Sequence, residues 1–186
     1  MKSFLERLQD PAPIVFDGGF GSQLFLRGIQ LTNSALANEL YPEAVVAIHG
    51  DYIEAGAEAI ETNTFVASPL HLAMAERDAD QAEELVRLAV RHARRAVEES
   101  GKPVYVAGSI GPSPGAIEAD AGGVDFGIAN AAVREAHQRV VGAMAEEGVD
   151  FFCIETMFSA KEAAMAAEAA RQTGLPIALK IGRAHV

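Results

Sequence analysis

The sequence predicts an α/β protein in which repeated β/α units are arranged around a parallel sheet. Short runs of β-branched or apolar residues alternate with longer, Ala-rich, charged stretches that suit helices. A glycine follows each of these helix-like stretches. The 186 residues are 49% hydrophobic, which is enough to bury a core, and the length fits one domain or part of a larger one.

Short apolar runs mark five expected strands, at 13–17, 57–62, 103–108, 149–155 and 176–180. Apolar residues that recur at intervals of three and four predict four long helices, at 42–55, 78–100, 127–147 and 159–173. The glycines expected to end these helices in the left-handed conformation are Gly56, Gly101, Gly148 and Gly174. Ser159 and Glu162 have the spacing of a capping box, so we expect the last helix to begin there.

The chain also resembles itself at two strands. Glu54-Ala-Gly-Ala-Glu leading to Ile60-Glu-Thr-Asn parallels Glu147-Gly-Val-Asp leading to Ile154-Glu-Thr-Met. The glycine lies five residues before Glu61 in the first copy and seven before Glu155 in the second. Both glutamates therefore have the same strand parity and are expected to point into one interior. This repetition fits a closed barrel and an open doubly wound sheet alike.

Ligand groups gather at the carboxyl ends of strands in parallel β/α folds, so the polar residues there form the candidate site. The first such group is Asp17-Gly18-Gly19-Phe20-Gly21-Ser22. Its glycines let backbone amides approach a ligand, and Asp17 can accept hydrogen bonds from an ammonium group. A Gly-rich turn in which Asp17 caps the next helix explains the segment equally well.

A second polar group, Glu61-Thr62-Asn63-Thr64-Phe65, follows a buried strand, where unpaired polar atoms are costly. We expect Glu61 and Thr62 to brace the loop by hydrogen bonds, and Asn63 and Thr64 to be the better ligand candidates. The third group is Gly108-Ser109-Ile110-Gly111-Pro112. It is either a backbone donor site for a carboxylate or a purely conformational turn.

The fourth group begins at Glu155, which follows an almost wholly apolar strand and should therefore meet a cation. A substrate ammonium would serve, and so would a lysine or arginine. Cys153 shares the strand parity of Glu155 and is interpreted as a small core residue. The five histidines form no close pair of metal-ligand type, and His49 and His92 are expected on helix surfaces or half-buried.

The ordered set Asp17-Gly-Gly-Phe-Gly-Ser, Glu61-Thr-Asn-Thr-Phe, Gly108-Ser-Ile-Gly-Pro and Ile154-Glu-Thr-Met resembles the homocysteine-binding domain of homocysteine S-methyltransferases. That family includes methionine synthase and betaine–homocysteine methyltransferase. The resemblance implies a TIM-type (β/α)8 barrel, truncated here to about four β/α units plus a fifth strand. Residues 1–180 would form the N-terminal part of this single domain.

The resemblance also implies a chemistry. In the family, zinc held by three cysteine thiolates binds the homocysteine sulfur and lowers the pKa of the thiol, and the thiolate then attacks a methyl group to give methionine. The ammonium of homocysteine is expected at the carboxylates of Asp17 and Glu155. Its carboxylate is expected at the backbone amides near Gly18 and Gly19 and at the hydroxyl of Thr64, and the side-chain amide of Asn63 is expected to brace the pocket. The residues that the resemblance assigns to substrate binding are Asp17, Gly18, Gly19, Asn63, Thr64 and Glu155.

The zinc-binding cysteines of the family lie after the sixth strand and around the eighth, and Cys153 matches none of them. We expect this chain neither to bind zinc nor to activate a thiol. The identity of the methyl donor stays open among methylfolate through a corrinoid, betaine and S-methylmethionine.

Residues 181–186 fit no barrel pattern. As codons ATC GGA AGA GCA CAC GTC they match a sequencing-library adapter, so a non-native tail is expected. A native stop codon after Val186 in genomic DNA would disprove this.

The net charge of −11, without a continuous basic tract, argues against nucleic acid and anionic lipid as partners. Residues 1–10 are too polar for a secretory signal, and no uncharged stretch approaches the roughly 20 residues that span a bilayer, so a cytoplasmic location is expected. Open sheet edges would favour self-association. Two other functions stay open: a non-catalytic amino-acid-binding or assembly module, and a TIM-barrel lyase or aldolase with Glu61 and Glu155 as acid and base.

Overall fold

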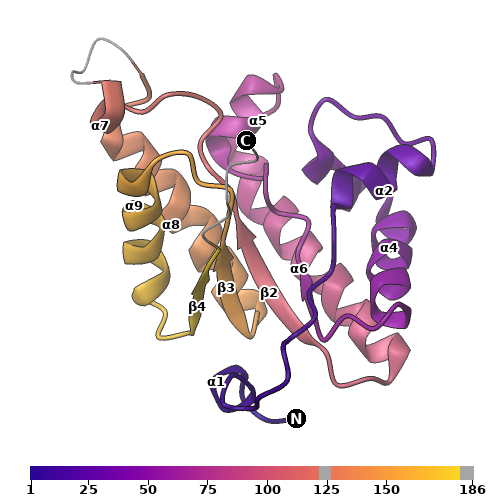
Figure 1. Ribbon diagram of the computed structural model, residues 1–186. Helices are drawn as coiled ribbons and strands as arrows, with labels where there is room; N and C mark the ends of the chain where they lie inside the picture. Colours follow the sequence, from indigo (N-terminus) through magenta and orange to yellow (C-terminus); the bar gives the residue numbers. More distant parts are fainter. Residues whose placement is uncertain (122–126, 181–186) are drawn as a thin grey trace, which may run out of the picture.

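The computed structural model describes residues 1–121 and 127–180, which form a parallel sheet with long helices packed along one face (Figure 1). The expected non-native tail, 181–186, lies outside the described residues. The sheet has the strand order β1-β2-β3-β4. Its strands are β1 (Ala59–Glu61), β2 (Tyr105–Ile110), β3 (Phe151–Ile154) and β4 (Ile177–Leu179). All neighbouring pairs are parallel, so their carboxyl ends meet at one edge of the layer.

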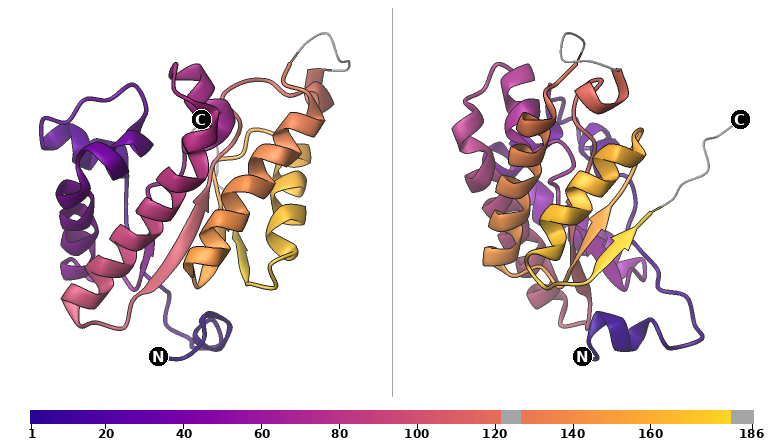
Figure 2. Two further views of the ribbon diagram at one scale, coloured as in Figure 1. Left: turned by 180° about the vertical axis from the view of Figure 1, so that it is seen from behind. Right: turned by 90° about the vertical axis from the view of Figure 1, so that its left-hand side faces the viewer.

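The long helices are those that the apolar periodicity predicts. They are α4 (Pro42–Glu54), α6 (Ala82–Ser100), α8 (Asn130–Glu147) and α9 (Ala160–Arg171). Seen from behind, α6 and α8 cross in front of the strands, which places them between the sheet and solvent (Figure 2). The four predicted C-terminal glycines all have positive φ, as the left-handed conformation requires: Gly56 +106°, Gly101 +64°, Gly148 +93° and Gly174 +77°.

Shorter helical segments complete the described chain. They are α1 (Phe4–Arg7), α2 (Phe20–Leu26), η1 (Ser34–Leu36), α3 (Ala37–Leu40), α5 (Pro69–Met74), η2 (Ala79–Gln81) and α7 (Glu118–Ala121). The segment η2 occupies the start of the helix expected at 78–100, so that α6 itself begins at Ala82. None of the described helices is both long enough and apolar enough to cross a membrane.

The expected first strand, 13–17, is wrong as a regular strand. The segment runs beside β1 but makes only one parallel bridge, between Phe16 and Ala59. Asp17 donates its backbone N–H to the carbonyl of Ala59 at 3.0 Å, and the carbonyl of Val15 accepts from Ala59 at 3.1 Å. Pro13 has no N–H to extend this ladder toward the N-terminus, which limits the segment to a short pairing.

The capping box predicted for α9 is half correct. The hydroxyl of Ser159 accepts the backbone N–H of Glu162 at 3.2 Å, as predicted. The return bond is not made to Ser159. The Glu162 carboxylate instead accepts both the backbone N–H and the hydroxyl of Ser113, each at 2.6 Å. A tertiary partner has thus replaced the local one.

Side chains alternate between the two faces of the sheet. Ile60, Val106 and Phe152 point toward the helices and belong to the large core beneath them. On the opposite face, Phe151 and the fully buried Cys153 join a second cluster, as expected for a small core cysteine. That cluster is covered by α1, whose Phe4 ring stacks on Phe151 with centroids 3.7 Å apart.

His49 is fully buried, so the expectation of a surface or half-buried position is wrong. It lies on the face of α4 that packs against α2 with Val45, Ile48 and Leu24, and its ring is 5.0 Å from that of Phe20. Neither ring nitrogen has a hydrogen-bond partner within residues 1–121 and 127–180. Burial lowers the pKa of His49 to about 3. His92 is half-buried as expected.

Candidate substrate pocket

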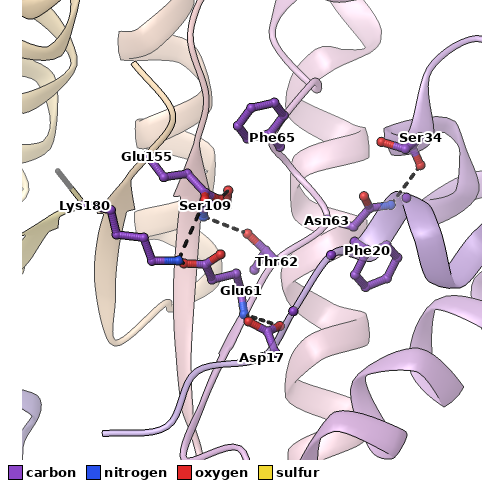
Figure 3. Close-up of a pocket in the computed structure, with 13 residues that line it drawn as sticks. Asp17, Phe20, Ser34, Glu61, Thr62, Asn63, Phe65, Ser109, Glu155 and Lys180 are labelled. Atoms are coloured by element: carbon purple, nitrogen blue, oxygen red, sulfur yellow. Dashed lines mark hydrogen bonds and ion pairs between the residues drawn. The ribbon is translucent and has the colours of Figure 1, made fainter. Parts of the chain in front are cut away.

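A cavity of about 490 Å³ opens at the carboxyl ends of the strands (Figure 3). Its lining combines acidic side chains, a Gly-rich loop and two aromatic rings. The lining residues are Asp17, Gly18, Gly19, Phe20, Gly21, Ser34, Glu61, Thr62, Asn63, Phe65, Ser109, Glu155 and Lys180. All four polar segments singled out in the sequence therefore meet at one place, as the parallel arrangement of their strands requires.

Asp17 lies where the chain leaves its pairing with β1. One carboxylate oxygen, Oδ2, accepts the backbone N–H of Glu61 at 2.8 Å. The other oxygen, Oδ1, is buried and has no hydrogen-bond partner in the described part of the chain. Burial, reinforced by the nearby charge of Glu61, raises the pKa of Asp17 to about 8. An acceptor oxygen without a donor in a cavity wall is suited to a ligand that donates.

Glu61 and Glu155 both reach the cavity, which confirms their predicted common parity. Lys180, directly after β4, forms an ion pair with Glu61, and its Nζ is 3.7 Å from Oε2 of Glu155. The hydroxyl of Ser109 donates to Oε1 of Glu155 at 2.9 Å. Burial and the charge of Glu61 raise the pKa of Glu155. The cation that Glu155 was expected to meet is thus a lysine of the chain in this structure.

Three hydroxyl-bearing residues join the ends of β1 and β2. The backbone N–H of Ser109 donates to Thr62 Oγ1 at 3.2 Å, and the hydroxyl of Thr64 donates to the carbonyl of Ser109 at 2.7 Å. The two threonine hydroxyls are 2.8 Å apart. Because the hydroxyl of Thr64 donates its only proton to the carbonyl of Ser109, Thr62 must be the donor in the bond between the two threonine hydroxyls. This closed set of bonds fixes Ser109 and therefore the direction of its side chain toward Glu155.

Asn63 holds the loop after β1 against the segment after α2. Its amide nitrogen donates to the carbonyl of Ser34 at 2.9 Å and to Oδ1 of Asn38 at 3.1 Å. Asn38 returns a bond to the carbonyl of Asn63 at 2.9 Å. Figure 3 shows the Asn63 side chain directed toward Ser34. The amide of Asn63 thus has the bracing contacts expected of it.

The Gly-rich loop forms the side of the cavity next to Asp17. The Tyr52 hydroxyl on α4 donates to the carbonyl of Gly19 at 3.1 Å, which anchors the loop. A Cβ at Gly18 would lie 3.0 Å from that hydroxyl, and one at Gly19 would lie 2.8 Å from Ser22 Oγ. Within the described chain, the amides of Gly18 and Gly19 donate to no protein acceptor. They are available to a ligand.

Five of the six predicted binding residues line this cavity, and the sixth, Thr64, is buried behind the wall with its hydroxyl occupied. Six further lining residues belong to the quoted motifs but lay outside the predicted set: Phe20, Gly21, Glu61, Thr62, Phe65 and Ser109. Strand parity was a signal for Ser109, which pairs in register with Cys153, two residues before Glu155. Ser34 comes from a distant loop, and no local pattern marked it.

The residues described offer no metal centre. No group of three His, Cys, Asp or Glu side chains among residues 1–121 and 127–180 is placed to hold an ion. The single cysteine of the sequence, Cys153, is fully buried, and burial raises the pKa of its thiol. A buried thiol with a raised pKa is poorly suited to bind a metal as thiolate.

The parallel β/α layer, with acidic side chains and free loop amides around a cavity at its carboxyl edge, defines a β/α protein of the barrel type with a polar pocket at the ends of its strands. Comparison with known proteins identifies the family. A model of the homocysteine S-methyltransferase family matches residues 14–182, and this chain belongs to that family.

Similar proteins agree with this assignment. The homocysteine S-methyltransferase of Escherichia coli K12 is 30% identical over 155 residues, which cover 77% of this chain and 50% of the relative. The methionine synthase of Mycobacterium tuberculosis is 33% identical over 154 residues, 77% of this chain and 12% of the relative. The chain thus spans about half the length of the first relative and a much smaller part of the second.

The fold is similar to that of a solved enzyme. The crystal structure of the homocysteine methyltransferase MmuM from Escherichia coli in its oxidized form superposes with a TM-score of 0.77 and 26% identity. The match covers 95% of this chain and 64% of MmuM. The predicted fold class, an α/β chain carrying about four β/α units plus a fifth strand of a TIM-type barrel, is confirmed, with segment 13–17 as a single bridge in place of a regular strand.

Proposed function

We propose that this chain provides the homocysteine-binding part of a homocysteine S-methyltransferase, which transfers a methyl group to the thiol of homocysteine to form methionine. One observation carries the proposal: Asp17, which lines the cavity together with Glu155, has a buried carboxylate oxygen without a hydrogen-bond partner in the described part of the chain, in a member of this family. The proposed partners are homocysteine and a methyl donor, and the identity of the donor stays open.

The ammonium group of homocysteine is assigned to Asp17 and Glu155. Two carboxylates around one ammonium form charge-assisted hydrogen bonds, which are stronger than neutral ones. Glu155 is already oriented by the hydroxyl of Ser109, at 2.9 Å. When the ligand binds, Lys180 would have to move away from Glu155. It would keep its ion pair with Glu61.

The carboxylate of homocysteine is assigned to the backbone amides of Gly18 and Gly19, which the chain leaves available. Asn63 braces the pocket through Ser34 and Asn38. Thr64 was predicted as a further carboxylate ligand. Because its hydroxyl donates to Ser109, we now assign it the support of that residue. Fixing both ends of the amino acid orients the sulfur, which is the positional part of the catalysis.

Zinc belongs to this proposal only through the family. One of the solved relatives is the metallated form of MmuM, which is 27% identical with a TM-score of 0.75. The described residues do not fit a zinc site, because the one thiol, Cys153, lies in the apolar cluster beside Phe151. We therefore assign to this chain the binding and orientation of homocysteine, and we expect the 186 residues alone neither to bind zinc nor to transfer a methyl group.

The lyase or aldolase alternative receives less support. It needs an unprotonated lysine for a Schiff base, which requires a lowered pKa. Lys180 is the lysine at the strand ends, and although burial opposes it, the hydrogen bond and charge of Glu61 raise its pKa. A non-catalytic amino-acid-binding module would use the same pocket. The cytoplasmic location, the lack of nucleic-acid partners and self-association through sheet edges stay predictions.

Isothermal titration calorimetry of the chain with L-homocysteine tests the proposal. We expect saturable binding that Glu155→Gln weakens by about tenfold or more, since a charge-assisted bond contributes roughly 1.5–3 kcal/mol. Glu39→Gln is the matched control, because Glu39 pairs with Arg77 on the surface. Absence of binding by the wild-type chain, or equal binding by Glu155→Gln, would contradict the assignment. Methyl transfer by the protein from the complete reading frame separates the enzyme from the binding module.

A further inference from the structure

We infer that Glu162, on α9, is a positioning residue for the pocket, because it fixes the turn 111–113 against which the pocket wall at Phe65 is packed. The inference rests on the proposed function only for the identity of the ligand. Glu162 lies outside the cavity lining, and it belongs to a different β/α unit from the turn that it holds.

The carboxylate of Glu162 accepts both hydrogen-bond donors of Ser113. Its Oε1 accepts the backbone N–H and the hydroxyl of Ser113, both at 2.6 Å. Pro112 and Pro114 flank Ser113 and have no backbone N–H, so Ser113 supplies the only backbone donor of segment 112–114. The prolines also restrict φ on both sides, so the turn moves as one stiff unit with its single anchor.

The anchor is itself held in place. Glu162 is 3% exposed, and its backbone N–H is capped by the hydroxyl of Ser159 at the start of α9. His137 on α8 brings Nε2 to 3.2 Å from the same Oε1. Although burial raises it, the hydrogen bonds from His137 and Ser113 hold the pKa of Glu162 below its ordinary value. The carboxylate is therefore a charged, fixed acceptor between two helices.

The turn reaches the pocket through Gly111 and Ser109. A Cβ at Gly111 would lie 2.6 Å from the carbonyl oxygen of Phe65 and 2.8 Å from its ring, so backbone and ring are in direct contact. Phe65 lines the cavity. Two residues before Gly111, Ser109 directs its hydroxyl to Glu155. A shift of the turn would therefore move both an aromatic wall and the group that orients Glu155.

Two measurements on the 186-residue chain test this role: the affinity for L-homocysteine by calorimetry, and the amide resonances of Ser109 and Gly111 in the ligand-free protein. We expect Glu162→Ala to weaken binding about tenfold and to shift both resonances. Glu162→Gln keeps an oxygen that can accept from Ser113, so it should stay within about threefold of wild type. Ser113→Ala, a milder change, should shift the same resonances and keep the chain folded.

Ala170→Gly is the matched control for stability, because Ala170 is buried on the same helix and lies about two helical turns beyond Glu162. It should lower the melting temperature and leave the affinity and both resonances unchanged. Unmoved resonances in Glu162→Ala and Ser113→Ala would overturn the inference, as would an affinity loss in Ala170→Gly equal to that in Glu162→Ala. If the wild-type chain does not bind homocysteine, the proposed function fails, and the resonances alone still decide the role of Glu162.

Discussion

One carboxylate oxygen of Asp17 accepts the backbone N–H of Glu61 at 2.8 Å, while its other oxygen is buried with no partner among the described residues. The first contact fixes the direction of the side chain, and the second oxygen is left without a partner in a residue that lines the cavity. Burial raises the pKa of Asp17 to about 8, so the group carries a proton at neutral pH. An ammonium beside it would favour the charged form.

Homocysteine binding at pH 7 should therefore release a proton from Asp17. Because release accompanies binding, the affinity should rise with pH, by at most about tenfold per pH unit, until Asp17 is ionised near pH 8. Calorimetry in buffers of different ionisation enthalpy counts the released protons. Asp17→Asn has no proton to lose there and should bind more weakly without release. Proton release that persists in Asp17→Asn would assign it to another group.

Asp17 should also make the fold less stable as the pH rises. Its carboxyl has an ordinary pKa of 3.8 and a pKa of about 8 in the folded chain, so the folded state holds a proton that the unfolded state has lost. Stability is full below about pH 4 and falls toward pH 8, by at most roughly 1.4 kcal/mol per pH unit. Urea unfolding at pH 5 and pH 8 should show a smaller fall in Asp17→Asn. An identical fall in both proteins would contradict the buried carboxyl.

His49 should have the opposite pH dependence. Its pKa falls from 6.5 to about 3 on burial. Between these two pH values His49 is protonated in the unfolded chain and neutral in the folded chain. Stability is therefore present above pH 6.5 and lost as the pH falls toward 3. His49→Leu removes two unpartnered nitrogens and should move the midpoint of acid unfolding, followed by circular dichroism, to lower pH. A midpoint at higher pH would mean that the imidazole has a partner the structure lacks.

Two glycines should respond in opposite ways to alanine. Gly111→Ala places a Cβ 2.6 Å from the Phe65 carbonyl, so it should cost about 1–3 kcal/mol of unfolding free energy and weaken homocysteine binding. Gly50 lies inside α4 with nothing within 4 Å of the added Cβ. Gly50→Ala should stabilise the chain by about 0.5–1 kcal/mol. Urea unfolding measures both, and a tolerated Gly111→Ala would show that the turn can move.

The sequence predicted the fold well wherever local chemistry decides the structure. Helix periodicity and terminal glycines such as Gly101 and Gly148 located the long helices, because left-handed residues are local requirements. The helix α5 has an equally local signal, with Ser68 as N-cap followed by Pro69. Segment 13–17 has the composition of a strand, but its pairing depends on Pro13 and on its single neighbour β1.

The site was predictable in its location more than in its contacts. The carboxyl ends of parallel strands fixed where Asp17 and Glu155 would meet. The partner of Glu155 was not predictable, because Lys180 comes close only through the packing of β4 beside β3. For the same reason the spacing predicts Glu162 as a local cap of Ser159, whereas in the folded chain its carboxylate binds Ser113. Local sequence patterns do not show which distant residues become hydrogen-bond or ion-pair partners when the chain folds.

The stacking of Phe4 on Phe151 has a consequence for biosynthesis. Phe4 of α1 is translated long before Phe151 of β3, so the stacked pair forms only after β3 has been made. At 5–20 residues per second, about seven to thirty seconds pass between the synthesis of Phe4 and that of Phe151. During that time α1 lacks the face of β3 on which its ring stacks. Chaperones that bind exposed aromatic side chains would meet Phe4 before β3 covers it.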